Sequence, residues 1–520
     1  MHTASAFPVV PPEGGTAGSF NFVLRSFEFV SNFVLRISNF WSPASNPTGL
    51  FTYGKKELLE QSRYSNETFF RTGCLLLGIL LATVVPGWAS ADSPNDTAPV
   101  ISEKESTPSD PWYREIELEW GGHLKVRGSA SRPDDESIFQ TVGTRTYYDG
   151  NVEGRITNML FFSEWGYVET HYEAVLSGGD TRRKGRELEQ LFPDLFRDGV
   201  LISQPPEDSR RLMDLTKTVD ESSDYLLYHR LDRLSLTLLP QWGVVRIGRQ
   251  AVTWGNGLLF NPMDLLNPFA PTDIERDYKI GDDLVATQFS VDGTGDVQFL
   301  YVPRRDPSSG DVEWDRSSLA GKLHCAVGTT EFDIMAARHY RDEVVGLGSR
   351  GYLGDAAWRV DATWTFLHEG AVSDDYLSLV ANMDYSWVWW KKNFYGFLEF
   401  FYNGLGDDQY TEAFSNPDIS ERLERGELFT LGRTYLSGHI RVELHPLFNV
   451  YLTLINNVAD PSGTLQPRAA WDVTQDVQVT FGASTSYGEK GTEYGGFGLP
   501  GTNFTSKAPN SGFLWLTYFF

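Results

Sequence analysis

Charged side chains of both signs gather in residues 255–283, the part of the sequence best suited to chemistry. They are Asp264, Asp273, Glu275, Arg276, Asp277, Lys279, Asp282 and Asp283. The chain carries no nucleotide-binding loop, zinc-ligand spacing or nucleophile elbow. Charged side chains around a passage select the solutes that enter it. We therefore expect solute selection here, with no cofactor, no metal site and no enzymatic activity.

The same stretch is too apolar for an ordinary surface loop. It holds Phe260, Leu265 and Phe269 among three prolines, and its two Asn-Pro steps favour defined turns. We expect it to fold inward against a surrounding wall and to narrow the passage. The residues that would form this constriction are Asp264, Asp273, Glu275, Arg276, Asp277 and Lys279. The alternative is an external cap or a partner-binding loop.

Four arginines precede this stretch: Arg230, Arg233, Arg246 and Arg249. Two arrangements fit them. One is a ladder for anionic solutes, and the other is a set of lumen salt bridges with Asp232 and the acidic stretch. Arg246 and Arg249 have opposite parity, so a regular strand cannot point both inward unless a bulge intervenes or one lies near an interface.

The elements that must position these charges are strands that alternate apolar and polar side chains. Near 430–445, for example, Arg441 and Glu443 alternate with Ile440 and Val442, so we expect both charges to face a polar lumen. Apolar-out, polar-in strands of about ten residues are typical of a membrane barrel. We expect about eighteen, or at least sixteen. They lie near 114–129, 146–163, 165–177, 224–239, 243–254, 284–292, 295–303, 317–328, 330–341, 343–353, 356–368, 376–389, 393–404, 430–445, 447–457, 463–473, 475–487 and 511–520.

The connections between these strands sort by length. Every second one is tight, whereas the long segments 178–223, 255–283, 304–316, 405–429 and 488–510 all fall on the alternate positions. Because neighbouring strands of an antiparallel barrel run in opposite directions, alternate connections share one end. Short turns at one end and long loops at the other are typical of a transmembrane barrel, and a soluble sandwich has no reason to show them. The predicted fold is all-β, a closed antiparallel barrel whose loop after strand 5 folds inward.

The last ten residues form a very apolar strand in which Tyr518 and Phe520 share one face with Leu514 and Leu516. Such a strand invites aggregation at an open edge but has two partners in a closed barrel. A terminal Phe after alternating apolar residues also resembles the assembly signal of bacterial outer-membrane barrels. The alternative is the closing strand of a soluble sandwich.

Three segments precede the predicted barrel of residues 113–520. Residues 1–70 are expected to be a disordered extension or the product of a start assigned too far upstream. Residues 71–91 look like a signal peptide, with an apolar core from Cys74 to Val85 and a small-residue cleavage site at Ala89-Ser90-Ala91. Residues 92–112, rich in Ser, Pro, Asp and Glu, are expected to be a flexible leader.

The amino-acid composition limits the classes of partner that the protein can bind. The formal net charge is −25, which leaves no basic surface for nucleic acid. Aromatic residues make up 14 %, which suits the girdles of a membrane barrel. The basic cluster at residues 182–186 would contact lipopolysaccharide or lie in a solvated loop. We expect outer-membrane lipid, lipopolysaccharide, the barrel-assembly machinery and a small polar or oligosaccharide solute as partners.

Residues 244–283 resemble uncharacterised bacterial outer-membrane porin-like barrels at Arg249-Gln250, Trp254-Gly255 and the two Asn-Pro steps. The Gly-Arg-Gln strand is similar to that of alginate-export-type barrels. The resemblance implies a pore or exporter in a Gram-negative outer membrane, and it carries over no individual substrate-binding residue. We therefore expect a channel that passes polar solutes, anionic ones included, through a constricted lumen. The alternatives are a plugged structural barrel whose loops bind polysaccharide or a cell surface, and an outer-membrane hydrolase.

Overall fold

The structure is a computed structural model that describes residues 116–143, 146–191, 204–272, 278–291, 295–499 and 502–520. The segments expected to hold the N-terminal extension, the signal peptide and the leader lie outside these residues.

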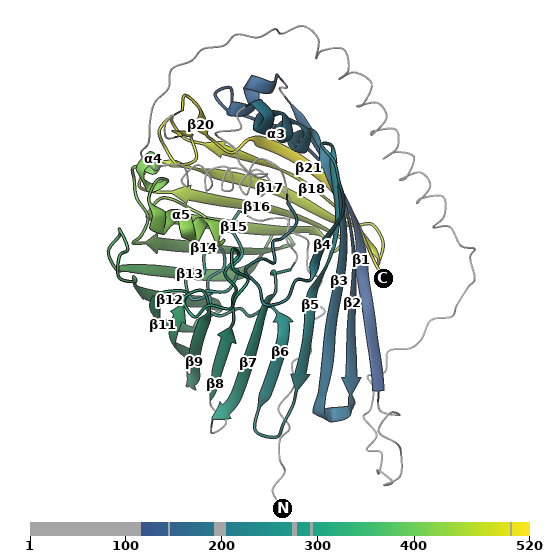
Figure 1. The fold of residues 1–520 in the computed structure, drawn as a ribbon, viewed down its shortest axis with the longest axis vertical. Coiled ribbons are helices and arrows are strands. Elements are labelled where there is room, and N and C mark those ends of the chain that lie inside the picture. Colours follow the sequence, from purple (N-terminus) through teal and green to yellow (C-terminus); the bar gives the residue numbers. More distant parts are fainter. Residues whose placement is uncertain (1–115, 144–145, 192–203, 273–277, 292–294, 500–501) are drawn as a thin grey trace, which may run out of the picture. The chain divides into compact units, whose positions relative to one another are not determined.

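In the described part of the chain, antiparallel strands form a closed wall (Figure 1). The main sheet has 19 strands, and all of them except β4, which pairs only with β5, belong to the wall. The wall closes because β21 pairs with both β18 and β1. This confirms the predicted barrel of eighteen strands. The wall strands are β1 (Ile116–Arg132), β2 (Tyr147–Phe162), β3 (Gly166–Gly179), β5 (Tyr225–Leu238), β6 (Val244–Gln250), β7 (Asp282–Val291), β8 (Gly295–Val302), β9 (Ser318–Val327), β10 (Thr330–His339), β11 (Asp342–Leu353), β12 (Ala356–Phe366), β13 (Tyr376–Trp389), β14 (Lys392–Asn403), β15 (Thr434–His445), β16 (Phe448–Asn457), β17 (Ser462–Asp472), β18 (Val477–Tyr487) and β21 (Asn510–Phe519).

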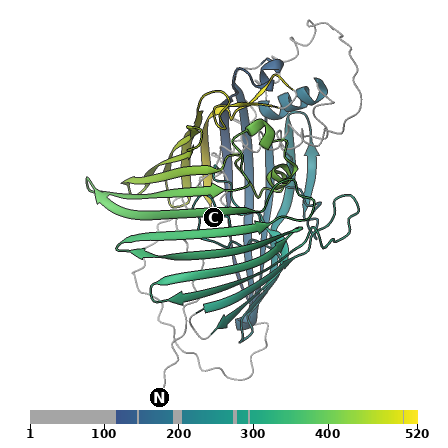
Figure 2. The ribbon, with the colours of Figure 1, turned by 90° about the vertical axis from the view of Figure 1, so that its left-hand side faces the viewer.

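The two ends of the wall differ. Tight turns such as 328–329, 354–355 and 390–391 join strands at one end (Figure 2). The longer connections leave from the other end and contain the remaining elements. These are η3 (Ile138–Val142), α3 (Asp180–Leu191), β4 (Thr216–Glu221), α4 (Tyr410–Ala413), α5 (Pro417–Glu424), β19 (Phe497–Gly498) and β20 (Thr505–Ser506). Only η4 (Ser163–Trp165) lies in a tight connection. The predicted sorting of loop lengths is therefore present.

Three boundaries differ from the sequence prediction. β6 ends at Gln250 rather than near 254, because the following residues turn into the barrel. β15 begins at Thr434 rather than near 430, because the backbone N–H groups of Leu431 and Gly432 bond to Glu493 in another loop. β1 ends at Arg132 rather than near 129. The helix α3 begins at Asp180, whose carboxylate suits the first turn of a helix.

Side chains alternate across the wall as a two-residue period requires. In β12, Asp361, Thr363 and Thr365 are buried on the inner face, whereas Val360 and Trp364 are exposed on the outer face. Other exposed apolar side chains extend this outer surface around the barrel, among them Ile156, Val285, Leu347, Leu398 and Leu514. Exposed tryptophans mark the short-turn end: Trp120, Trp165, Trp242, Trp389, Trp390 and Trp471. Among the described residues, no helix combines the length and the apolarity needed to cross a membrane.

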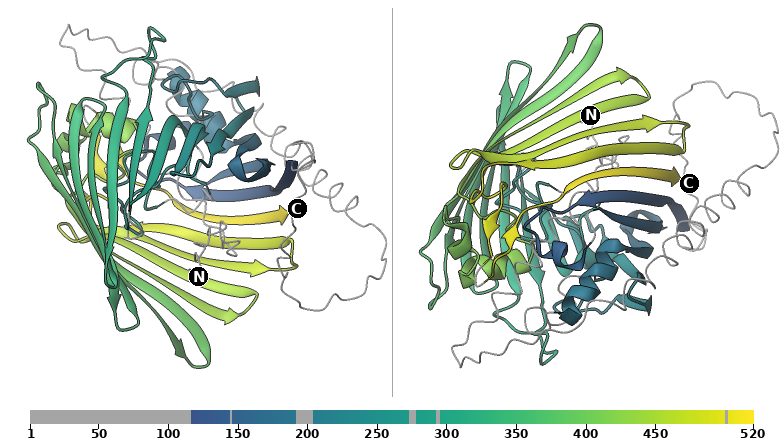
Figure 3. Two further views of the ribbon diagram at one scale, coloured as in Figure 1. Left: turned by 90° about the horizontal axis from the view of Figure 1, so that it is seen from below. Right: turned by 90° about the horizontal axis from the view of Figure 1, so that it is seen from above.

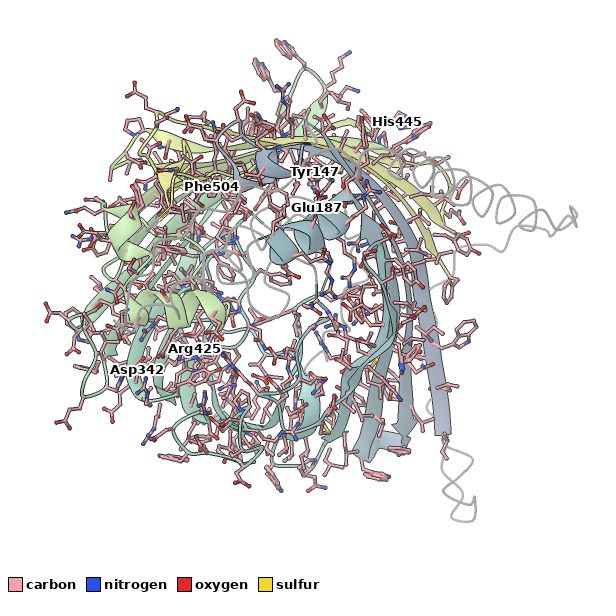
Figure 4. All side chains as sticks on the ribbon, turned by 45° about the horizontal axis from the view of Figure 1, so that its top comes forward. Tyr147, Glu187, Asp342, Arg425, His445 and Phe504 are labelled. Carbon is pink, nitrogen blue, oxygen red and sulfur yellow. The ribbon has the colours of Figure 1, made fainter. Side chains whose placement is uncertain are left out.

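At the loop end, an apolar cluster joins several long connections. It includes Ile138 of η3, Leu188 of α3, Phe414, Ile419 of α5 and Phe497 of β19, all buried. We call this cluster the loop-end cap. Figure 4 looks toward this end, with Asp342 and Arg425 on one side and Tyr147 and Glu187 on another.

Candidate functional site: a loop across the lumen

The connection between β6 and β7, residues 251–281, bonds to the inner face of distant strands, and we call it the lumen loop. The carboxylate of Glu399 on β14 accepts three of its backbone N–H groups, from Leu258 at 2.6 Å, Leu259 at 3.0 Å and Phe260 at 2.8 Å. Glu399 is completely buried. One side chain thus satisfies three consecutive buried donors, which would otherwise be costly to leave unpaired.

Further anchors flank this one. Asp361 of β12 accepts hydrogen bonds from the backbone N–H of Asn256 and from its Nδ2, the latter at 2.8 Å. Gln466 of β17 donates from Nε2 to the carbonyl oxygen of Thr272 at 3.3 Å. The lumen loop is therefore held by polar contacts from three separate strands.

An apolar contact accompanies the Glu399 anchor. The ring of Phe260 stacks on Phe401 of β14 with centroids 4.3 Å apart, and it lies 5.4 Å from the ring of Tyr435. These side chains form a buried cluster with Val380 and Ile455. Burying such aromatic surface favours this position of the loop.

The returning arm of the lumen loop contacts the opposite wall. Tyr278 stacks on His123 of β1 at 5.9 Å, and the guanidinium of Arg155 lies 4.1 Å from the Tyr278 ring centroid. Arg233 of β5 donates to the carbonyl oxygen of Lys279. Because β5 is the fourth wall strand and β14 the thirteenth of eighteen, half the circumference separates these contacts. The loop therefore crosses the lumen. Figure 3 shows the wall of strands from below and from above.

Two of the six predicted constriction residues lie in the described part of the loop, and they form a buried ion pair, Asp264 with Lys279. Burial raises the pKa of the Asp264 carboxyl to about 6, and burial also lowers the pKa of the Lys279 ammonium. The attraction between the two charges opposes both shifts without cancelling them. Asp273, Glu275, Arg276 and Asp277 lie outside the described residues.

Three of the four predicted arginines have acidic partners. Arg230 pairs with Glu173, and Arg233 pairs with Asp232 at 2.8 Å. Arg249 pairs with Asp283 at 2.8 Å and with Asp208 at 3.0 Å. Arg246 is exposed, on the same face as the buried Thr237 opposite it on β5.

Arg246 and Arg249 are three positions apart and would face opposite sides of a regular strand. The glycine between them allows both to lie on the inner side. Gly248 has a φ of 122°, outside the range of ordinary strand residues, while β6 keeps its register with both neighbours. Arg249 consequently reaches the inner network. A register bulge, which the sequence suggests, is not required.

The other predicted charges have varied surroundings. Arg441 lies 5.6 Å from the ring centroid of Tyr395, and Glu443 accepts a hydrogen bond from Asn393 at 3.2 Å. The basic residues of α3 are each paired, with Glu221, Asp180, Glu187 or Glu189.

The predicted assembly residues end the closing strand. Tyr518 and Phe520 are exposed on the outer face with Leu514, and Phe520 exchanges two backbone hydrogen bonds with Gly122 of β1, at 3.0 and 3.1 Å.

The sequence does not predict that Glu399 and Asp361 bind the lumen loop. The sequence offers a weak signal for Glu399, since it is the one acidic residue of β14, among six aromatic side chains. Its partner segment, 141 to 139 residues away in sequence, gives no local signal.

A cavity with an empty volume of about 860 Å³, open to solvent, lies between the lumen loop and the inner faces of β11 to β14. Residues 422–430 complete its lining. Among the described residues, no group of three or more His, Cys, Asp or Glu side chains is placed to hold a metal ion.

No family model and no curated protein matches the chain. Solved structures resemble it at low identity. A BenF-like porin from Pseudomonas fluorescens Pf-5 is 9 % identical, with 78 % of this chain and 98 % of that chain covered and a TM-score of 0.43. OccAB1 of Acinetobacter baumannii is 8 % identical, with coverage of 77 % and 96 % and a TM-score of 0.43. Wzi of Escherichia coli, described as a carbohydrate-binding β-barrel involved in capsule assembly, is 10 % identical, with coverage of 76 % and 83 % and a TM-score of 0.43. We draw no functional argument from these likenesses.

Proposed function

We propose that the protein is a porin-like channel or exporter of the bacterial outer membrane that passes polar solutes through a constricted lumen. The lumen loop is the main support, since it crosses a closed barrel and is held on opposite walls. The outer surface supports the membrane location, because a band of exposed apolar side chains ends at a row of tryptophans. Outer-membrane lipid would surround that band, and Tyr518 and Phe520 would present the assembly signal.

The test is conductance. The full chain would be expressed in a Gram-negative host, purified from outer membranes in detergent and added to a planar bilayer in symmetric salt. We expect steady single-channel currents, and a salt gradient would then give the ion selectivity from the reversal potential. A correctly folded protein that stays silent would refute the channel.

Selectivity for anions, which the sequence leaves open together with alginate-like substrates, has weaker support. Arg230, Arg233 and Arg249 are engaged by carboxylates, so little of their charge is available to a solute. Arg246 is the exposed member of the set. An anion-selective reversal potential that Arg246→Gln abolishes would support the anionic class.

A second candidate is a plugged barrel whose loops bind polysaccharide or a cell surface. The loop-end cap favours it, because buried apolar residues from η3, α3, α5 and β19 join the long connections to one another. Conductance separates the two functions, since a plugged barrel would be silent and a channel would conduct.

A further inference from the structure

The cavity beside the lumen loop has an amphipathic lining. Apolar side chains come from both sides, with Phe260 and Leu265 on the loop, Tyr376 and Phe401 on the wall and Phe429 beyond them. Polar side chains lie between these. A few placed polar groups within a largely apolar lining are typical of a site for a small molecule.

Every carboxylate that lines the cavity already has a cation as its partner. Asp264 pairs with Lys279, and Asp342 pairs with Arg422. Glu427 pairs with Arg425 at 2.8 Å and bonds to His339 at 2.9 Å. These charges compensate one another, so a charged solute entering the cavity would lose water without gaining a free counter-charge.

Among the uncharged polar groups of the lining residues, in contrast, some atoms have no hydrogen-bond partner among the described residues. Asn403 is 2 % exposed, and its Nδ2 donates to none of the described residues, although its Oδ1 accepts from Leu405 at 3.2 Å. The Oδ1 of Asn261, on the loop side, is likewise buried and accepts no hydrogen bond from any residue described. Thr363 and Thr365 add hydroxyl groups on the wall between them. The lining residues thus include a buried amide donor and a buried amide oxygen without described partners, together with two hydroxyls.

We propose that this cavity binds a neutral polyhydroxylated solute, such as a small sugar, on its way through the barrel. The assignment rests on the proposed channel function and names its substrate class. Hydroxyl groups of such a solute pair with Asn403, Asn261, Thr363 and Thr365, and its carbon face packs on aromatic rings of the lining.

The experiment compares matched sugars on the full protein in detergent. Calorimetry would measure the binding of glucose, maltose and glucuronate, because glucuronate differs from glucose by one carboxylate. We expect the neutral sugars to bind and glucuronate to bind at least about tenfold more weakly, since its charge finds no free partner. Maltose should also block the current in a planar bilayer, saturating at concentrations that match the calorimetric Kd.

Three variants locate the site. Thr365→Val removes one hydroxyl at constant size, and Asn403→Asp removes the free donor while keeping the acceptor that bonds to Leu405. Each should weaken maltose binding by about five- to tenfold. Thr237→Val, equally buried on β5 and remote from the cavity, is the matched control and should change the Kd less than twofold.

The outcomes separate the two proposals. Glucuronate binding as tight as glucose binding, no sugar binding by the folded protein, or Kd values unchanged in Thr365→Val would each overturn the cavity assignment, and steady conductance would then leave the channel standing. A silent bilayer with sugar binding that Thr365→Val weakens would refute the channel and support the cavity as a sugar site.

Discussion

Glu399 holds the lumen loop to the wall through a single side chain. Its carboxylate bonds to three consecutive N–H groups of the lumen loop from inside a barrel wall. A glutamine at this position keeps the size but replaces an acceptor by a donor that faces those N–H groups. Each buried group left unpaired costs about 1–3 kcal/mol, so the loop should detach before the barrel unfolds.

We therefore predict that Glu399→Gln raises the single-channel conductance and its current noise, while the barrel keeps its heat-modifiable mobility on gels. Glu331→Gln is the matched control, since Glu331 pairs with Arg350 on an exposed part of β10. Equal conductance in wild type and Glu399→Gln would contradict a loop that narrows the lumen.

Asp264 should make the net charge of the lumen loop depend on pH. As the pH falls through about 6, the carboxylate takes up a proton. Lys279 can only gain positive charge over the same interval, so the site becomes more positive. Because the pKa of Asp264 is raised in the folded protein, its contribution to stability decreases as the pH rises from about 4 to 6 and is constant above.

The expected result is a reversal potential that shifts toward anion selectivity between pH 7 and pH 5. Asp264→Asn should show the acidic selectivity already at pH 7 and should lose this part of the pH dependence. If Asp264→Asn titrates like the wild type, other groups are responsible for the shift.

At the scale of the element, β6 changes the direction of its side chains at one glycine, Gly248. A Cβ at Gly248 would meet the carbonyl oxygen of Leu234 at 2.2 Å, and the φ of 122° disfavours any other residue. Gly248→Ala should therefore destabilise the barrel by about 2 kcal/mol or more, measured as a lower midpoint of unfolding in urea. Gly154→Ala on β2, where a Cβ would meet nothing within 4 Å, is the control and should leave the midpoint unchanged within error.

The elements were predictable to different degrees for a physical reason. Strands such as β12 show their two faces in the local alternation of Val360 and Trp364 with Asp361 and Thr363. The contact between Glu399 and Leu258 depends instead on the stagger of the strands and on which wall the loop reaches. Neither the strand stagger nor the wall strand that the loop contacts leaves a local pattern in the sequence. The apolar residues of the loop therefore predict that it folds inward, but the sequence does not predict which wall residues bind it.

At the scale of the whole barrel, the wall encloses two different interiors. Beside β1 to β5 the lumen contains paired charges such as Arg155 and Asp232, at 2.7 Å. Beside β11 to β14 it contains the amphipathic cavity. Asp264, which pairs with Lys279, lines this cavity from the side of the lumen loop.

The pairing of β1 with β21 also has a consequence for biogenesis. These strands register His123 with Phe519 and Arg132 with Asn510, contacts that span nearly the whole barrel sequence. Such distant contacts make folding slow, and until they form, both end strands expose unpaired edges. Until the final strand joins the first, the chain therefore exposes apolar strand edges that favour aggregation.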